Sequence, residues 1–346
     1  MIYTNLPHTD IEVSKICLGT MTWGNQNTEE EGHEQINYAI DKGVNFLDTA
    51  ELYPVPAHKD RYAATEKVIG NWFKKNGNRE DIVLASKIAG KADMTKFIRT
   101  TGFTRESIID AVEGSLQRLQ TDYIDLYQLH WPDRSTNYFG QRGYKHDISD
   151  HWEDNIHQVL ETMRDLIREG KIKHVGISNE TPWGTMRFLE ESKVHGTLPR
   201  TITIQNPYSL LNRLFEVGMA EISMREQVGL LAYSPMGFGA LSGKYLGDRM
   251  PEGSRLSLFP QYNRYIGKTA VEATKKYYEL AQANGLTLAQ MALAFVNTRP
   301  FVTSTIIGAT SMRQLEENID SIDVNLSEDI IEKIEAIHNS IPNPAP

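Results

Sequence analysis

Four polar residues in the first 130 positions have side chains suited to proton transfer. They are Asp48 and Tyr53 in the stretch "DTAELYP", Lys87 after "DIVLAS", and His130 after "YIDLYQL". Asp48, Lys87 and His130 each end a short apolar run that is typical of a buried strand. A carboxylate in such a place is costly to bury unless a partner satisfies it. Lys87 is the natural partner, and we expect the Asp48–Lys87 pair to lie beside Tyr53.

The chemistry of this group follows from charge. A free phenol has a pKa of about 10, and a neighbouring ammonium lowers that pKa by favouring the phenolate. Lys87 would therefore make Tyr53 a better proton donor near neutral pH, while Asp48 keeps Lys87 protonated. His130 would hydrogen-bond a substrate oxygen. Such a site suits protonation of a carbonyl oxygen, but no side chain in it supplies electrons, so a reduction needs a cofactor.

Each of the four residues alone has a plain structural explanation, such as a helix cap for Asp48 or a satisfied core position for His130. Their arrival at three consecutive strand ends indicates a site. A different chemistry that uses the same residues is a lyase or aldolase with Lys87 as a Schiff-base nucleophile. No H-E-x-x-H motif or paired Cys/His spacing is present, so we expect no metal site.

Short apolar runs recur along the chain and predict strands that are covered on both faces. These runs are residues 15–19, 44–48, 81–86, 123–130, 172–178, 201–205, 228–234 and 303–308. Helical patterns lie between them, at 29–43, 104–120, 151–171, 181–196, 268–285 and 310–322. Gly43 and Gly170 fit the position just after a helix end, and Thr181 followed by Pro182 fits a helix start.

The alternation of strands with helical segments predicts an α/β fold, a (β/α)8 TIM barrel in a single domain over 1–346. A doubly wound open sheet would normally carry G-x-G-x-x-G after its first strand, and "GTMTWGNQN" does not match. We expect residues 1–13 to form a hairpin below the barrel and 327–338 to form an extra C-terminal helix. Long loops at 88–103, 131–151 and 236–268 all follow strands, on the side where barrels keep active sites.

Composition excludes several classes of protein. The formal net charge of −9 argues against a nucleic-acid-binding surface. Cys17 is the sole cysteine, so no intramolecular disulfide can form, which fits a cytoplasmic protein, and its apolar setting favours a buried hydrophobe over a reactive thiol. The N-terminus lacks the pattern of a secretory signal, and no apolar run has the length of a membrane span.

Eight short motifs, taken together and in this order, resemble those of the aldo-keto reductase superfamily, which reduces carbonyls with NAD(P)H on a (β/α)8 barrel. The resemblance covers nearly the whole chain and is strongest to the longer bacterial members of the Tas-like type. The motifs are "LGTMTWG" (18–24), "NFLDTAELYP" (45–54), "SK" (86–87), "LYQLHWP" (126–132), "GISN" (176–179), "IQNPYSLLNR" (204–213), "AYSPMGFGALSGKY" (232–245) and "QLEENI" (314–319).

The resemblance implies a catalytic tetrad of Asp48, Tyr53, Lys87 and His130, with Tyr53 as the general acid. It implies NADP(H) as cofactor and a small carbonyl compound as substrate, with Trp23 and Trp131 as walls of the substrate pocket. It implies that Ser178, Asn179 and Gln205 hold the nicotinamide carboxamide while Tyr233 stacks on the ring. The implied cofactor contacts continue through Ser234, Pro235, Met236, Gly237, Phe238, Gly239, Ala240, Leu241, Ser242, Gly243, Lys244, Arg255, Gly308, Gln314, Glu317 and Asn318.

In that scheme the glycine-rich segment 234–244 wraps its backbone N–H groups around the pyrophosphate, and Lys244 and Arg255 add positive charge. Many family members carry an arginine near the adenosine 2′-phosphate, where this chain has Gln314, a variant resembling the potassium-channel β-subunit branch. NADPH is the expected cofactor. The alternative function is a nicotinamide-binding redox sensor or regulatory subunit with slow turnover, and a homo-oligomer is compatible with either function.

Overall fold

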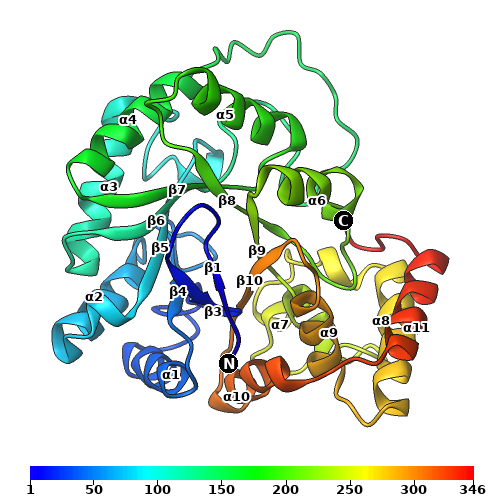
Figure 1. Cartoon of the computed structure of the whole chain (residues 1–346). Coiled ribbons are helices and arrows are strands. Elements are labelled where there is room, and N and C mark those ends of the chain that lie inside the picture. The colour runs from blue at the N-terminus through cyan, green and yellow to red at the C-terminus, as the bar shows by residue number, and fades with distance from the viewer.

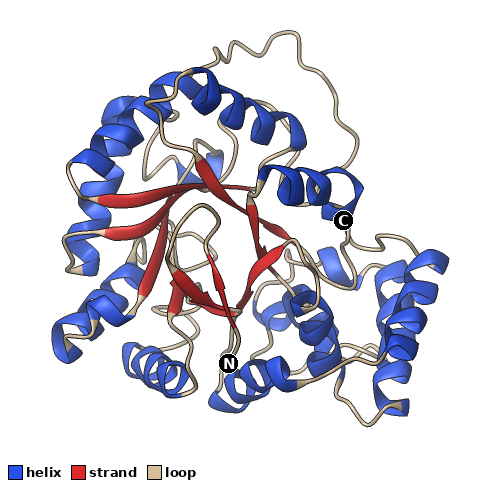
Figure 2. Cartoon of the chain, in the orientation of Figure 1, coloured by secondary structure: helices blue, strands red, loops and turns tan.

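The structure is a computed structural model that describes residues 1–346, and its centre is a closed barrel of parallel strands surrounded by helices (Figure 2). Consecutive strands pair along the barrel, and β10 closes it by pairing with β3. The predicted TIM barrel is thus confirmed, and each of the eight predicted runs overlaps one strand. These strands are β3 (Ile16–Gly19), β4 (Phe46–Asp48), β5 (Val83–Ile88), β6 (Ile124–Leu129), β7 (Ile172–Ser178), β8 (Thr201–Pro207), β9 (Gly229–Tyr233) and β10 (Val302–Ile307).

Helices cover the outside of the barrel. Six of them, α1 to α6, connect consecutive strands from β3 to β9, while α9 precedes β10 and α10 follows it. The extra C-terminal helix is present as α11, which lies against α8 at the side of the barrel (Figure 1). The helices are α1 (Glu29–Asp41), α2 (Ala64–Asn76), α3 (Arg105–Leu119), α4 (Ile156–Arg168), α5 (Pro182–Val194), α6 (Phe215–Glu226), α7 (Arg255–Leu258), α8 (Lys268–Ala283), α9 (Leu288–Asn297), α10 (Met312–Asp320) and α11 (Glu328–Ser340).

Helix ends follow the expected capping chemistry at several places. Thr181 caps α5 by accepting from the Gly184 N–H, with Pro182 as the first helical residue. Gly43 follows α1 with a φ of 84°, a left-handed conformation that glycine adopts without a Cβ penalty. The start of α4 differs from the prediction: the helical pattern begins at residue 151, but the helix begins at Ile156.

Local side-chain hydrogen bonds explain the late start of α4. The Asp150 carboxylate accepts from the Trp152 N–H at 3.0 Å, and the Asp154 carboxylate accepts from the Ile156 N–H at 3.1 Å. Such contacts offer the backbone an alternative to helical hydrogen bonds. Residues 150–155 therefore stay outside the helix.

The N-terminal hairpin pairs β1 (Tyr3–Asn5) with β2 (Glu12–Ser14) and crosses one end of the barrel, as predicted (Figure 1). Its Leu6 is fully buried and belongs to the innermost apolar cluster of the barrel. Cys17 lies in the same cluster, where burial raises the pKa of its thiol well above the ordinary value. Cys17 is accordingly a packed hydrophobe, and the hairpin closes the end of the barrel that carries no polar site.

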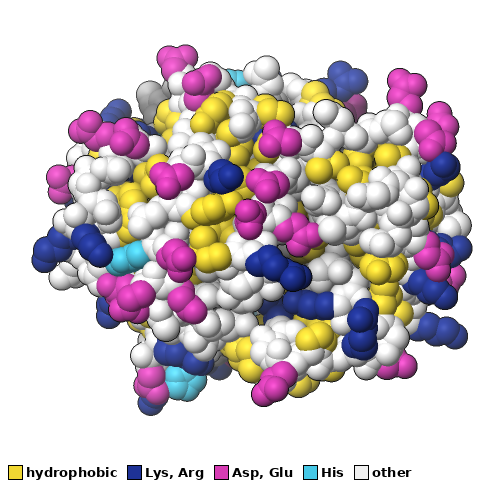
Figure 3. All heavy atoms as spheres, turned by 90° about the horizontal axis from the view of Figure 1, so that it is seen from below, with side chains coloured by type: hydrophobic (Ala, Val, Ile, Leu, Met, Phe, Trp, Pro, Cys, Tyr) yellow, Lys and Arg dark blue, Asp and Glu magenta, His cyan; other side chains and the backbone are white.

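The outer surface is mixed in character. On the face seen in Figure 3, acidic and basic side chains are interspersed, and hydrophobic groups reach the surface between them. No helix is both long enough and apolar enough to cross a membrane. The polar groups that matter for function lie inside the barrel, at its other end.

Candidate active site

A polar layer lies directly above the apolar filling of the barrel. Phe46, Ala85 and Leu126 belong to the buried inner cluster on β4, β5 and β6. Because side chains in a strand alternate between faces, the residues two positions further along point into the same interior. These residues are Asp48, Lys87 and Gln128, and all three are buried.

The Asp48 carboxylate is fully satisfied within this layer. Lys87 Nζ donates to Asp48 Oδ2 at 2.7 Å and also to the Thr49 carbonyl at 2.7 Å. Gln205 Nε2 donates to Asp48 Oδ1 at 2.8 Å. Burial is the largest single effect and lowers the pKa of Lys87, but the charges of Asp48 and Tyr53 and hydrogen bonds to both together outweigh it, so the net pKa of Lys87 is raised. Lys87 is therefore held as an ammonium, as the sequence predicts.

Tyr53 lies beside this ion pair. Lys87 Nζ is 4.9 Å from the centre of the Tyr53 ring. Burial raises the pKa of Tyr53, whereas the Lys87 charge lowers it, and the net pKa is above the ordinary value. The expectation that Lys87 would bring the pKa of Tyr53 below that of a free phenol is thus wrong for the protein alone, because burial is the larger effect. The phenol is protonated at neutral pH.

His130 follows β6 and faces the same space. Its ring centre is 5.8 Å from that of Tyr53 in an edge-on arrangement. Burial and the Lys87 charge hold the pKa of His130 well below its ordinary value, so the imidazole is neutral. Its Nδ1 atom is buried without a hydrogen-bond partner. The structure thus brings together all four residues of the expected tetrad.

A large cavity of about 1220 Å³ opens at this end of the barrel. Asp48, Tyr53 and His130 line it, while Lys87 lies beneath the surface. Most of the expected cofactor contacts line it too: Asn179, Gln205, Tyr233, Ser234, Pro235, Met236, Phe238, Gly239, Ser242, Lys244, Arg255, Gly308, Gln314, Glu317 and Asn318. The cavity therefore joins the tetrad to the segments expected to hold a dinucleotide.

The nicotinamide end of this expected site is preorganised by hydrogen bonds. The Tyr233 hydroxyl donates to Asn179 Oδ1 at 2.6 Å, and Asn179 Nδ2 donates to the His130 carbonyl at 2.9 Å. Ser178 does not line the cavity; its hydroxyl donates to the Gln205 carbonyl at 2.8 Å. Ser178 thus supports Gln205 from behind.

The glycine-rich segment after β9 differs from the expectation. Residues Gly237–Ser242 form short 3-10 turns with a kink at Phe238 and Gly239, and four N–H groups of this segment already donate to nearby backbone carbonyls. Those groups are therefore not free to wrap around a phosphate. The four donors are Gly237, Gly239, Leu241 and Gly243. Only Gly239 among them lines the cavity. Ala240, another expected cofactor contact, is buried and does not line the cavity.

Cationic side chains, and not these backbone N–H groups, offer positive charge to an anionic ligand in the cavity. Lys244, Arg255, Arg264 and Arg313 line the cavity, and none has a carboxylate within ion-pair distance. Burial lowers the pKa of Lys244, and neighbouring Arg255 lowers it further. Burial likewise lowers the pKa of Arg255. Partly desolvated cations without counter-charges form a site that an anionic ligand would stabilise.

The far end of the cavity is formed by α10 and the start of α9. Gln314 Oε1 accepts from the Thr310 N–H at 3.0 Å, Glu317 Oε1 accepts from the Thr287 hydroxyl at 2.6 Å, and Asn318 Nδ2 donates to the Gly308 carbonyl at 3.2 Å. These contacts fix the three side chains expected at the adenosine end.

The two tryptophans expected to wall the substrate pocket do not reach the cavity. Trp23 is fully buried under α1, where its Nε1 donates to Gln35 Oε1 at 3.1 Å. Trp23 has a core role, because its indole ring fills the space over Gly32. Trp131 lies one layer behind His130, with ring centres 4.9 Å apart. The cavity walls near Tyr53 are instead Met21, Leu52, Val55, Ala57 and Phe139.

The loop between β6 and α4 reaches this wall through a single stretch. Phe139 and Gly140 line the cavity, and Arg264 donates to the Phe139 carbonyl. Earlier in the loop, Arg134 forms two hydrogen bonds to Glu180, at 2.5 and 3.0 Å, away from the cavity. This loop is therefore anchored at both places.

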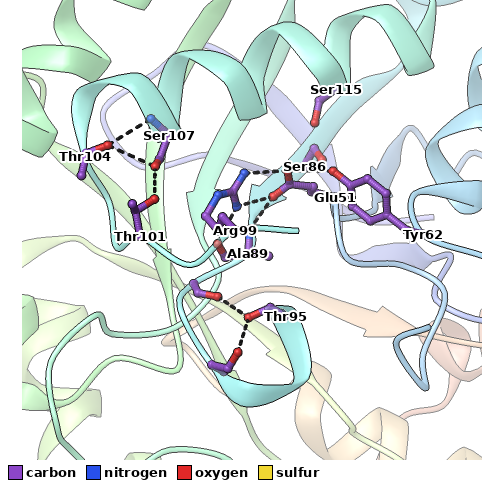
Figure 4. Close-up of polar contacts among 12 residues, drawn as sticks. Glu51, Tyr62, Ser86, Ala89, Thr95, Arg99, Thr101, Thr104, Ser107 and Ser115 are labelled. Atoms are coloured by element: carbon purple, nitrogen blue, oxygen red, sulfur yellow. Dashed lines mark hydrogen bonds and ion pairs between the residues drawn. The ribbon is translucent and has the colours of Figure 1, made fainter. Parts of the chain in front are cut away.

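Glu51, inside "DTAELYP", is a functional candidate that the sequence did not reveal (Figure 4). It is buried and accepts hydrogen bonds from Arg99, from the Ala89 N–H at 2.9 Å and from the Tyr62 hydroxyl at 3.0 Å. Gln128 was also missed, although its place two residues before His130 on a strand would have indicated that it faces the same interior. Both residues position the tetrad.

Comparison with known proteins agrees with this geometry. A model of the aldo/keto reductase family matches residues 15–339. Protein tas of Escherichia coli (strain K12) is 48% identical over 353 residues and covers the whole of both chains. The uncharacterized oxidoreductase YrpG of Bacillus subtilis is 32% identical over 97% of this chain and 96% of its own. A probable voltage-gated potassium channel subunit beta of Oryza sativa subsp. japonica is 29% identical over 99% of this chain and 98% of its own.

These matches run across the barrel, the tetrad and the cavity. They confirm the resemblance read from the eight motifs, including the likeness to Tas. The family is one of oxidoreductases that act on carbonyl compounds, in keeping with a proton donor at the mouth of the barrel. The chain belongs to the aldo/keto reductase family.

Proposed function

We propose that the protein reduces aldehyde or ketone carbonyls to alcohols with NADPH, and that Tyr53 supplies the proton. One observation carries the proposal: the Tyr53 phenol and four unpaired cations line the same cavity. A proton donor next to a site for a polyanionic ligand matches the needs of a nicotinamide-dependent reduction. The substrate takes up a hydride at carbon and a proton at oxygen.

The cavity suits the cofactor by the charge and type of its lining residues. Lys244 and Arg255 offer positive charge for the pyrophosphate, and Arg313 lies beside the start of α10 for a 2′-phosphate. Tyr233 lines the cavity next to the tetrad, where its ring offers a face for the nicotinamide. When bound, the cofactor supplies the hydride.

The chain's own residues handle the proton. Tyr53 is protonated at neutral pH, and the phenolate left after donation lies next to the Lys87 ammonium, which stabilises it. Asp48 keeps Lys87 charged through the 2.7 Å contact. Neutral His130 donates a hydrogen bond that orients the substrate oxygen toward Tyr53.

The substrate class follows from the walls. Next to Tyr53 the lining is apolar, formed by Met21, Leu52, Val55, Ala57 and Phe139. Such walls accept an aliphatic or aromatic body and leave its carbonyl group to the polar end. We therefore propose small apolar aldehydes and ketones as substrates.

The Schiff-base alternative does not suit the position of Lys87. Its side chain is fully buried beneath the cavity, and its raised pKa keeps the amine protonated. A nucleophilic lysine needs the neutral amine and access to the carbonyl. Lys87 has neither.

A regulatory subunit that binds nicotinamide is the second candidate. Large apolar side chains are exposed on the adjacent helices α5 and α6, among them Trp183, Met186 and Val217, with exposed fractions of 55%, 41% and 78%. Where such exposed groups form a contiguous patch, the surface commonly binds another protein. Turnover distinguishes the two candidates, because a sensor would oxidise NADPH slowly with every carbonyl compound offered.

The test is NADPH oxidation over a panel of aliphatic, aromatic and dicarbonyl compounds. We expect multiple turnovers with at least the simple aromatic aldehydes, and loss of turnover in Tyr53→Phe. Tyr144→Phe is the matched control, because Tyr144 is exposed and does not line the cavity. If no compound is turned over while NADPH binds, the regulatory candidate replaces the reductase.

A further inference from the structure

Two histidines and a glutamate meet on the outside of the barrel, away from the cavity. His157 lies in the first turn of α4, and Glu191 lies in the last turn of α5. His195 is the first residue after α5. These two helices are neighbours (Figure 1). None of the three residues lines the cavity.

Each of the three residues offers one ligand atom within reach of a single ion, and the contact between His157 and Glu191 has to lengthen for an ion to bind. His157 Nδ1 is 2.6 Å from Glu191 Oε1, and His195 Nε2 is 3.2 Å from the same oxygen. One ligand atom from each residue lies within 4.8 Å of the others. In a tetrahedral zinc site with bonds of about 2.0–2.1 Å, neighbouring ligand atoms are about 3.4 Å apart. Both imidazoles are nearly half exposed, so their rings have room to adjust.

The surroundings of Glu191 hold it in a ligand's orientation. Arg187 Nη1 contacts Glu191 Oε2 at 2.6 Å, which leaves Oε1 facing the two imidazoles. The second nitrogen of His157, Nε2, faces the Glu161 carboxylate at 3.7 Å. Metal-binding histidines commonly direct their other nitrogen toward such a group.

We propose that His157, Glu191 and His195 bind a divalent transition metal ion, with Zn²⁺ as the ion that best fits two imidazoles and one carboxylate. Water fills the fourth position, because the two histidines are exposed to solvent. The ion links the start of α4 to the end of α5 and stabilises this pair of helices. It has no part in the reduction.

The test is a calorimetric titration of the full, tag-free chain with Zn²⁺ alone. We expect one equivalent to bind, and expect His157→Gln and His195→Gln each to weaken binding by about tenfold or more. His151→Gln is the matched control, because His151 is exposed and outside the cluster, and it should bind as the wild type does. All three replacements are at exposed positions, so the variants should fold.

Two further readouts make the proposal falsifiable. Co²⁺ in place of Zn²⁺ should give the intense visible absorption of a tetrahedral site in the wild type and not in the double variant His157→Gln, His195→Gln. Saturating Zn²⁺ should raise the melting temperature of the wild type, since an ion that binds only the native state stabilises it, but should leave that of the double variant unchanged. Equal Zn²⁺ binding by the wild type and the double variant, or no binding by either, overturns the proposal.

Discussion

The Arg99 guanidinium donates two hydrogen bonds to the Glu51 carboxylate, from Nη1 to Oε2 at 2.6 Å and from Nη2 to Oε1 at 2.7 Å. Glu51 stands two residues before Tyr53, and Arg99 comes from the loop after β5, which begins two residues beyond Lys87 (Figure 4). The pair thus links the segment that contains Tyr53 to the loop that follows β5, the strand that contains Lys87. Arg99 Nη1 also donates to the Ala89 carbonyl at 2.7 Å, which fixes the loop itself.

Breaking this pair should destabilise the fold. Arg99→Met leaves the buried Glu51 carboxylate without its cation, and such a loss costs about 3 kcal/mol or more of unfolding free energy. Arg99→Lys should cost less, because one hydrogen bond can be kept. Urea unfolding measures both. The control is Arg105→Met, which breaks an ion pair with Asp165 that is largely exposed and should cost less than about 1 kcal/mol. Equal losses for Arg99→Met and Arg105→Met would contradict a positioning role for Arg99.

Tyr53→Phe should keep the fold and NADPH binding but lose carbonyl reduction by about a hundredfold or more, the usual cost of losing a general acid. The phenyl ring keeps the packing within the cluster that Tyr53 shares with Leu52 and Trp131. The measurement is steady-state reduction of 4-nitrobenzaldehyde, with NADPH binding followed by fluorescence. Reduction at a near wild-type rate would remove Tyr53 from the mechanism.

Charge changes at Lys87 and Asp48 should shift the pH–rate profile in the same direction, with the larger shift for Lys87. Lys87 lowers the pKa of Tyr53, so Lys87→Met should raise that pKa and move the alkaline limb of the profile to higher pH. Asp48 keeps Lys87 protonated, so Asp48→Asn should weaken the Lys87 charge and move the same limb to higher pH by a smaller amount. Profiles of kcat/KM report groups of the free enzyme and are the measurement to use. Profiles that match the wild type in both variants would show that the three groups are not coupled.

The sequence predicts the barrel well because its signals are local. Each strand is a short apolar run, and side chains at the ends of parallel strands must converge, which is why Asp48, Lys87 and His130 were placed together correctly. Helices α2, α6 and α9 were not singled out. For α2 the reason is physical, since it begins after Ala63 in a left-handed conformation with no side-chain cap. For α9 the signal was present, as Thr287 and Gln290 form a capping box.

Features that depend on tertiary packing were beyond the sequence. "TMTWGN" gives no sign that Trp23 turns away from the cavity to bond Gln35. The resemblance implies that backbone N–H groups of the glycine-rich segment surround a pyrophosphate, but its glycines form tight turns, with φ of 91° at Gly239 and 76° at Gly243. The Glu51–Arg99 contact joins residues 48 positions apart, and no local pattern announces it.

Cofactor choice yields the last prediction, because NADPH differs from NADH by a 2′-phosphate that needs cations or strong donors to replace its water. Arg313 is exposed at the start of α10 and lines the cavity without a carboxylate partner. Gln314 Oε1 is held by the N–H and hydroxyl of Thr310, at 3.0 and 3.2 Å, which leaves Nε2 free to donate. Ser311 caps this helix, whose N-terminal end favours an anion.

We therefore expect NADPH to bind more tightly than NADH in fluorescence titrations. Arg313→Gln should weaken NADPH binding by about tenfold, the equivalent of one charge-assisted hydrogen bond, and leave NADH binding nearly unchanged. Gln314→Glu should also reduce the preference for NADPH over NADH, because its carboxylate repels the 2′-phosphate. Lys276→Gln is the control, since Lys276 is an exposed cation that does not line the cavity. Higher salt should weaken NADPH binding more than NADH binding, because it screens the extra charge. Equal affinities for the two cofactors in the wild type would refute the assignment and make the protein dual-specific.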